Sequence, residues 1–124
     1  MPLPADAMLD VLRAIGEETR LRIAALLRHG ELTVTDLTEI LGQSQPRISR
    51  HLKLLNEAGV VDRHREGSWM FFHLVTRGPI GDVVERVLAE IDPHDPAAAA
   101  DLDRLDICLL YTSPSPRDLN PNLG

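Results

Sequence analysis

Apolar residues recur at the i, i+3 and i+4 spacing of amphipathic helices through the first part of the chain. We expect a first helix that is capped by Asp6 and ends at Gly16. A second helix follows and runs to Gly30, because glycine commonly terminates helices. Both carry enough apolar residues on one side to contribute to a shared core.

Two further helices are predicted in close succession. The third begins at the N-cap Thr33, with Asp36 three residues later in a variant of the capping box, and ends at Gly42. The fourth begins at the N-cap Ser44 and runs to Ala58. Because only a short glycine-containing segment separates them, the pair predicts a helix-turn-helix.

Beyond this pair the period changes to two over residues 60–75, which predicts a β-hairpin with its tip at Gly67. Side chains of the second strand alternate between two faces, with Met70, Phe72 and Leu74 on one and Trp69, Phe71 and His73 on the other. We expect one set to close the core and the other to lie nearer the surface. The predicted fold is therefore mainly α with a small β-hairpin.

A fifth helix is predicted from Pro79 to Ile91, with one continuous apolar stripe. Together with the first helix it offers more apolar surface than a small core can cover. A homodimer formed through the first and fifth helices is the simplest way to bury it.

Length and composition agree with a single globular domain: 124 residues, 44% hydrophobic and 26% charged. The lone Cys108 excludes an internal disulfide and a multi-thiolate metal site. With no apolar run long enough to span a membrane and no signal-like N-terminus, we expect a cytoplasmic protein with no membrane partner.

Charge is unevenly distributed. The formal charge is -6, yet residues 43–77 hold six Lys and Arg against three acids, whereas the rest of the chain holds 7 against 16. On the predicted fourth helix, Ile48, His51 and Leu52 fall on the core side. The remaining circumference carries donors and cations but no acid before Glu57, and this pattern favours an anionic partner over an ordinary solvated surface.

Residues 44–55, Ser-Gln-Pro-Arg-Ile-Ser-Arg-His-Leu-Lys-Leu-Leu, and residues 57–61, Glu-Ala-Gly-Val-Val, precede an Arg-x-Gly-x-Trp hairpin tip at 65–69. In this order they resemble the ArsR/SmtB family of bacterial winged helix-turn-helix repressors, over about residues 8–91. The resemblance implies a homodimer that binds double-stranded DNA sequence-specifically. Each fourth helix would lie in a major groove and each wing would reach the flanking minor groove or backbone.

The resemblance assigns DNA-contacting roles to ten residues. Gln45, Arg47, Ser49 and Arg50 are candidates for base edges or nearby phosphates, since Arg pairs bidentately with guanine and Gln with adenine. Lys53, Arg63 and Arg65 are expected on phosphates. The set is completed by Ser44, His51 and Gly67.

No metal, cofactor or catalytic residue is predicted. The thiolate motif of the family's arsenic sensors corresponds here to residues 31–37, where Thr33 and Thr35 replace both cysteines. The zinc-type site of the terminal helices is also missing, because Asp82 is followed by two valines. His73, His94, Asp92 and Asp95 lack recognisable ligand spacing.

Three segments are expected: residues 1–92 as the DNA-binding and dimerisation domain, 93–107 as an acidic, alanine-rich linker or short helix, and 108–124 as a disordered tail foreign to the fold. Residues 78–105 also resemble the regulator part that precedes an S-adenosylmethionine-dependent methyltransferase in some bacterial proteins. Two alternatives to a simple repressor therefore stay open: a truncated regulatory module of such a fusion, and a metal-responsive repressor with atypical ligands. In each case the present chain is not an enzyme.

Overall fold

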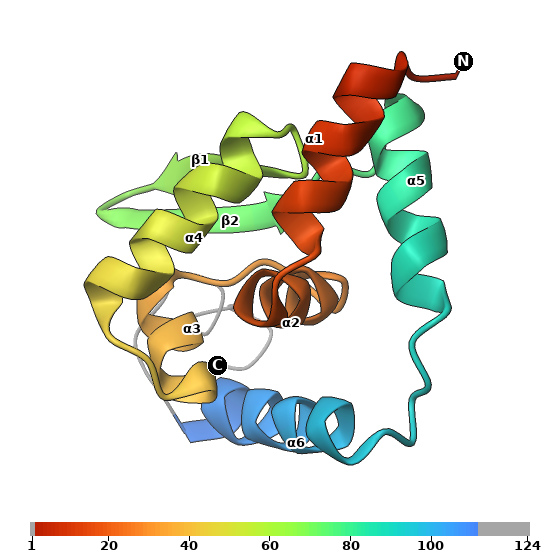
Figure 1. Cartoon of the computed structure of the whole chain (residues 1–124). Helices are drawn as coiled ribbons and strands as arrows, with labels where there is room; N and C mark the ends of the chain where they lie inside the picture. The colour runs from red at the N-terminus through yellow and green to blue at the C-terminus, as the bar shows by residue number, and fades with distance from the viewer. Residues whose placement is uncertain (1, 112–124) are drawn as a thin grey trace.

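The computed structural model describes residues 2–111 and contains six helices and one hairpin in that range (Figure 1). In chain order these are α1 (Ala5–Ile15), α2 (Glu18–Leu27), α3 (Val34–Leu41), α4 (Gln45–Glu57), β1 (Val61–Glu66), β2 (Trp69–Leu74), α5 (Gly78–Ala89) and α6 (Pro96–Tyr111). The fold predicted from the sequence, mainly α with a β-hairpin, is confirmed.

The caps of α3 and α4 confirm the predicted helix-turn-helix. The Thr33 hydroxyl accepts from the Asp36 amide at 3.1 Å, while the Asp36 carboxylate accepts from the Thr33 amide at 3.0 Å. Gly42 takes the left-handed conformation (φ +66°) that closes α3, and the Ser44 hydroxyl caps α4 through the Arg47 amide at 3.4 Å. These local hydrogen bonds fix the turn between the two helices.

The first two helices begin differently from the prediction. Pro4 occupies the N-cap of α1 without a side-chain cap, and Asp6 lies inside the first turn, so the predicted Asp6 cap is wrong. The N-cap of α2 is Glu17, whose carboxylate accepts from the Arg20 amide at 3.0 Å. The helix ends at Leu27, three residues before the predicted Gly30.

The core lies between α1, α2, α3, α4 and the hairpin. Its most enclosed side chains, each at most 1% exposed, include Val11, Ile23, Leu26, Leu32, Leu37, Ile48, Leu52, Leu55, Val60 and Val61. In Figure 1, α1 and α5 lie side by side at one end, α6 crosses the other end below α2 and α3, and α4 forms the outer edge beside the hairpin. This arrangement leaves one long side of α4 open to solvent.

The predicted hairpin is confirmed, and its register places Val61 opposite Leu74 and Glu66 opposite Trp69. Gly67, at the tip, has φ +61°, a conformation that favours glycine. One prediction needs correction, because both faces of β2 carry a buried aromatic: Phe72 is 7% exposed and Phe71 only 1%. Phe71 is covered on the second face by His64, whose ring stacks on it at a centroid distance of 5.8 Å.

Apolar side chains remain open on α1. Leu9 and Leu12 are 48% and 43% exposed, and the neighbouring Val83 and Val87 of α5 are only half-buried. The sequence predicts that these two helices carry more apolar surface than the core covers, and the exposed side chains agree with that prediction.

Helix α6 is longer and better packed than predicted. It continues to Tyr111, so the boundary expected at residue 108 does not coincide with the end of the helix, and both Leu105 and Cys108 are buried. Asp101 joins it to α2 by accepting from Arg22 Nε at 2.9 Å and Nη2 at 2.8 Å. The rest of the predicted tail, 112–124, lies outside the described residues. Over residues 2–111, no helix has the length and apolar character needed to cross a membrane.

Candidate nucleic-acid interface

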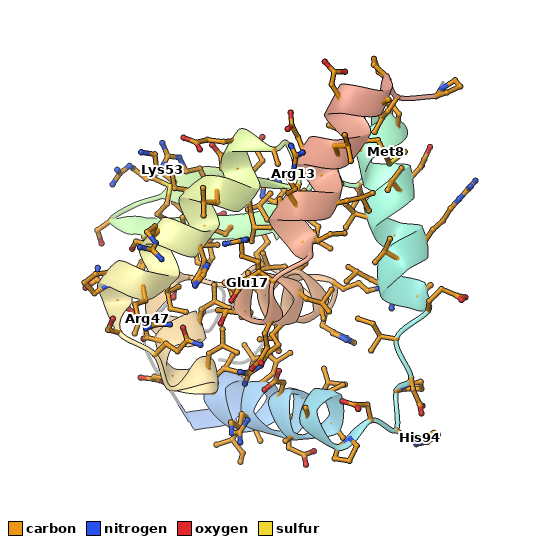
Figure 2. All side chains as sticks on the ribbon, in the orientation of Figure 1. Met8, Arg13, Glu17, Arg47, Lys53 and His94 are labelled. Atoms are coloured by element: carbon orange, nitrogen blue, oxygen red, sulfur yellow. The ribbon has the colours of Figure 1, made fainter. Side chains whose placement is uncertain are left out.

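The exposed side of α4 and the hairpin carry five cations, which we call the basic face: Arg47, Arg50, Lys53, Arg63 and Arg65. All five are exposed, and Figure 2 shows Arg47 and Lys53 along the outer edge of the molecule. Within the part of the chain that the structure describes, none of the five forms an ion pair.

Arginines elsewhere are mostly neutralised by nearby carboxylates. Arg28 pairs with Glu85 at 2.6 Å and lowers the pKa of that carboxyl by its hydrogen bond. Arg22 donates two hydrogen bonds to Asp101, and this raises the pKa of the guanidinium further. The basic face therefore combines positive charge with donors that no carboxylate of the described residues occupies, an arrangement suited to a polyanion.

The opposite side of α4 packs into the core. Ile48, Leu52 and Leu55 are 0%, 1% and 0% exposed, and their spacing of four and three residues keeps them on one face. Burial of these side chains holds the helix with Arg47 and Arg50 directed outward.

His51 gives α4 a polar contact within this apolar side. Arg20 Nη1 lies 3.3 Å from His51 Nδ1, and Arg20 Nε donates to the Ala14 carbonyl at 2.6 Å. Glu17 lies 3.8 Å from the same His51 nitrogen. Burial lowers the pKa of His51, helped by the positive charges of Arg20, Arg50 and Arg47 and opposed by Glu17. The neutral ring can accept from Arg20 at Nδ1.

Glu17 shows the complementary effect. Partial burial disfavours its ionised form, yet the amide of Arg20 and the charges of His51 and Arg20 outweigh burial and lower its pKa. Sequence reasoning missed both Glu17 and Arg20 as supports of α4. Neither stands out in the helical periodicity, because their contact with His51 joins segments more than thirty residues apart.

The structure changes the predicted set of DNA-contacting residues at one position. His51 is only 5% exposed, so the expectation that it contacts DNA is corrected: the side chain supports α4 from beneath. Gln45, Ser49 and Gly67 are exposed as that role requires, and Ser44 is exposed while its hydroxyl serves as the helix cap. For these residues and the basic face, contact with DNA stays a prediction.

The positions that correspond to the family's metal ligands can be located in the structure. Thr33 uses its hydroxyl in the capping box of α3, and Asp82 is exposed on α5. Among residues 2–111, the one grouping of three or more potential ligands joins Glu31, His64 and His73, and it excludes His94, Asp92 and Asp95. Sequence reasoning missed this grouping.

Helices α3 and α4, the hairpin that follows and the flanking helices define a winged helix-turn-helix protein. Residues 17–63 match the family model described as "Bacterial regulatory protein, arsR family". An uncharacterized HTH-type transcriptional regulator of Methanocaldococcus jannaschii is 34% identical over 84 residues, covering 67% of this chain and 89% of that protein. The chain belongs to the ArsR family.

Two further similarities concern characterised or solved proteins. The arsenical resistance operon repressor of Escherichia coli K12 is 45% identical over 67 residues, which cover 53% of this chain and 57% of the repressor. The chain thus spans little more than half the length of the arsenic-resistance regulators that it matches. A homodimeric winged helix-turn-helix DNA-binding domain from Mycobacterium bovis, solved by NMR, is 26% identical, with a TM-score of 0.59 over 73% of this chain and 86% of that one.

Proposed function

We propose that this protein is a homodimeric, sequence-specific DNA-binding transcriptional repressor. The observation that carries the proposal is the basic face: five exposed cations without an ion pair in the described structure, on the helix and hairpin that such folds apply to DNA. Membership of the ArsR family supports the same conclusion, since matched relatives are named repressors.

In the proposed complex α4 enters the major groove. Gln45, Arg47, Ser49 and Arg50 lie on its N-terminal half and are the candidates for base edges. Lys53 follows on the same exposed side, and with Arg63 and Arg65 on the wing it would bind phosphates. The α4 N-terminus adds a favourable dipole for a phosphate near Ser44.

Dimerisation through α1 and α5 would double this surface. The exposed Leu9 and Leu12 would be removed from water, and two copies of α4 would be placed about 34 Å apart, one turn of DNA. Twofold symmetry then requires a near-palindromic operator. The homodimeric neighbour from Mycobacterium bovis supports this assembly. We also infer that the chain is a regulator and not an enzyme, because its matched relatives are transcriptional regulators.

Selection of bound duplexes from a random pool tests the proposal. We expect recovery of a near-palindrome whose half-sites are separated by about one helical turn. Arg47→Ala and Arg50→Ala should each weaken binding to the selected site by about 1–3 kcal/mol per half-site and relax base preference at one position per half-site. Arg104→Ala, which removes an exposed arginine from α6, is the matched control and should bind like the wild type. Failure to enrich any sequence, or equal effects of Arg50→Ala and Arg104→Ala, would refute the proposal.

A further inference from the structure

Three potential ligands from separate segments meet at the base of the wing. Glu31 lies between α2 and α3, His64 lies on β1 and His73 lies on β2. One ligand atom from each of the three side chains lies within 4.8 Å of the other two. None of the three residues belongs to the basic face. None is at Thr33, Thr35 or Asp82, the positions that correspond to metal ligands of the family.

Backbone pairing explains why these residues meet. Leu32 and Phe72 form an isolated antiparallel bridge with N–O distances of 3.1 and 2.9 Å, and this bridge holds the neighbouring Glu31 beside β2. His64 is paired with Phe71, two residues from His73 on the adjacent strand, so the two histidines are diagonal neighbours on one face of the hairpin. Their ring centroids are 5.5 Å apart.

The buried nitrogen of His73 leaves the group one nitrogen that can coordinate an ion. Glu31 Oε2 lies 3.3 Å from His64 Nε2, a contact that already directs the carboxylate toward the ring. His73 Nδ1 is buried and has no hydrogen-bond partner among the described residues. Glu31 and His64 expose 45% and 37% of their side chains, so an ion can reach the group from solvent. The Phe71 ring stacks on the His64 ring and lies on the protein side of the group.

We propose that Glu31, His64 and His73 bind a divalent transition-metal ion, with Zn²⁺ as the best match. Two imidazole nitrogens and one carboxylate oxygen are a ligand set that Zn²⁺ uses, with a water completing the tetrahedron. Tetrahedral Zn²⁺ with bonds of about 2.0–2.1 Å separates its ligand atoms by about 3.3 Å. The three groups therefore need to approach one another by at most about 1.5 Å, which side-chain rotation can supply.

The donor set also limits which ions fit. It contains no thiolate, so Cu(I) and arsenite are excluded as ligands of this site, whereas Co²⁺ and Ni²⁺ can share it with Zn²⁺. The proposal departs from the sequence-based expectation of no metal, which rests on the missing thiolates, on the terminal helices and on the lack of ligand spacing at His73, His94, Asp92 and Asp95. Glu31, His64 and His73 have no recognisable spacing because a loop and two strands bring them together.

Metal binding would join β1, β2 and the segment before α3 through one ion. The wing would then be held against the body at a second point besides the Leu32–Phe72 bridge. The site itself is independent of DNA binding. Only its effect on Arg63 and Arg65 rests on the proposed function, since these wing cations would be held in a narrower range of positions.

The test uses the full, untagged chain without DNA. Titration with Co²⁺ should give visible d–d absorption of tetrahedral type that saturates at about one equivalent per chain and is abolished by Zn²⁺. Glu31→Gln, His64→Gln and His73→Gln should each weaken Zn²⁺ binding at least about tenfold in a competition assay. The matched control is His94→Gln, which alters an exposed histidine on the connection between α5 and α6 and should bind Zn²⁺ like the wild type (Figure 2).

Hydrogen exchange provides the second measurement. Zn²⁺ should slow amide exchange over residues 61–74 in the wild type and in His94→Gln, but not in Glu31→Gln, whose substitution lies on an exposed loop and leaves the hairpin intact. The proposal is overturned by a lack of tetrahedral Co²⁺ absorption, or by Zn²⁺ affinity that Glu31→Gln and His64→Gln leave unchanged. Because neither measurement includes DNA, both are separate from the test of repressor function.

Discussion

The substitution Lys53→Gln tests whether the two basic faces of the proposed dimer bind DNA phosphates. Lys53 is exposed on α4 and, within residues 2–111, is not paired with a carboxylate, so its replacement removes one cation without breaking a contact within the protomer. Glutamine keeps most of the aliphatic length and the helix propensity of lysine. The expected effect is therefore electrostatic.

The magnitude follows from the number of cations. Five per protomer give ten in a dimer, and if all ten neutralise phosphates the slope of log K against log salt is about -9. Lys53→Gln removes two, which reduces the slope to about -7. When salt is raised from 50 to 200 mM, the affinity of both proteins falls, and the factor by which it falls should be about tenfold smaller for the variant than for the wild type.

Fluorescence anisotropy with a selected duplex at a series of salt concentrations measures this slope. Arg104→Gln on α6 removes an equal charge outside the basic face and should leave the slope unchanged. Far-UV circular dichroism of both variants checks that the helices are retained. A slope that Lys53→Gln leaves at the wild-type value, or that Arg104→Gln lowers equally, would contradict the reasoning.

Three other substitutions test the dimer, the support of α4 and the packing of α5. Leu12→Lys should yield a monomer by sedimentation at concentrations where the wild type is dimeric, while Ile107→Lys, an exposed apolar residue of α6, should not. The pKa of His51 lies below its ordinary 6.5, so the unfolded chain binds the proton first and the folded protein loses stability as pH drops below about 6.5. His51→Asn should therefore make the melting temperature less dependent on pH between about pH 5.5 and 7. A pH dependence equal to that of the wild type would exclude His51 as its cause. Gly81→Ala should lower the free energy of unfolding, measured by urea denaturation, by about 1–3 kcal/mol, because the added Cβ would lie 2.7 Å from the Thr76 carbonyl carbon. A variant as stable as the wild type would show that the backbone at this position moves to accommodate the methyl group.

The features that the sequence predicted correctly are mostly local. Thr33 with Asp36 and Ser44 with the Arg47 amide form caps over three residues, so their pattern is visible in the chain. The hairpin tip at Gly67 is equally local. Periodicity also gave the buried side of α4, and the exposed cations follow from it as the remaining circumference.

The features that were missed depend on contacts between distant segments. Phe71 and Phe72 are both buried because β2 has the core on one side and His64 on the other, which alternation alone does not indicate. The pairing of Arg22 with Asp101 spans 79 residues and holds α6 against α2, so a segment predicted to be a linker or a short helix is part of the packed body. The Glu31, His64 and His73 grouping has the same origin.

Polar support of α4 has a consequence for how the helix proposed to bind DNA is positioned. Apolar packing through Ile48 and Leu52 permits small rotations of a helix, because dispersion contacts have little directionality. The hydrogen bond between Arg20 and His51 is directional, and Arg20 is itself fixed by the Ala14 carbonyl at the end of α1. A shift of α1 would therefore reach the centre of α4 through these two contacts. Since α1 is the helix proposed for the dimer interface, the same residues that place α4 relative to the core would also relate it to the second protomer, and both half-sites of an operator would depend on this geometry.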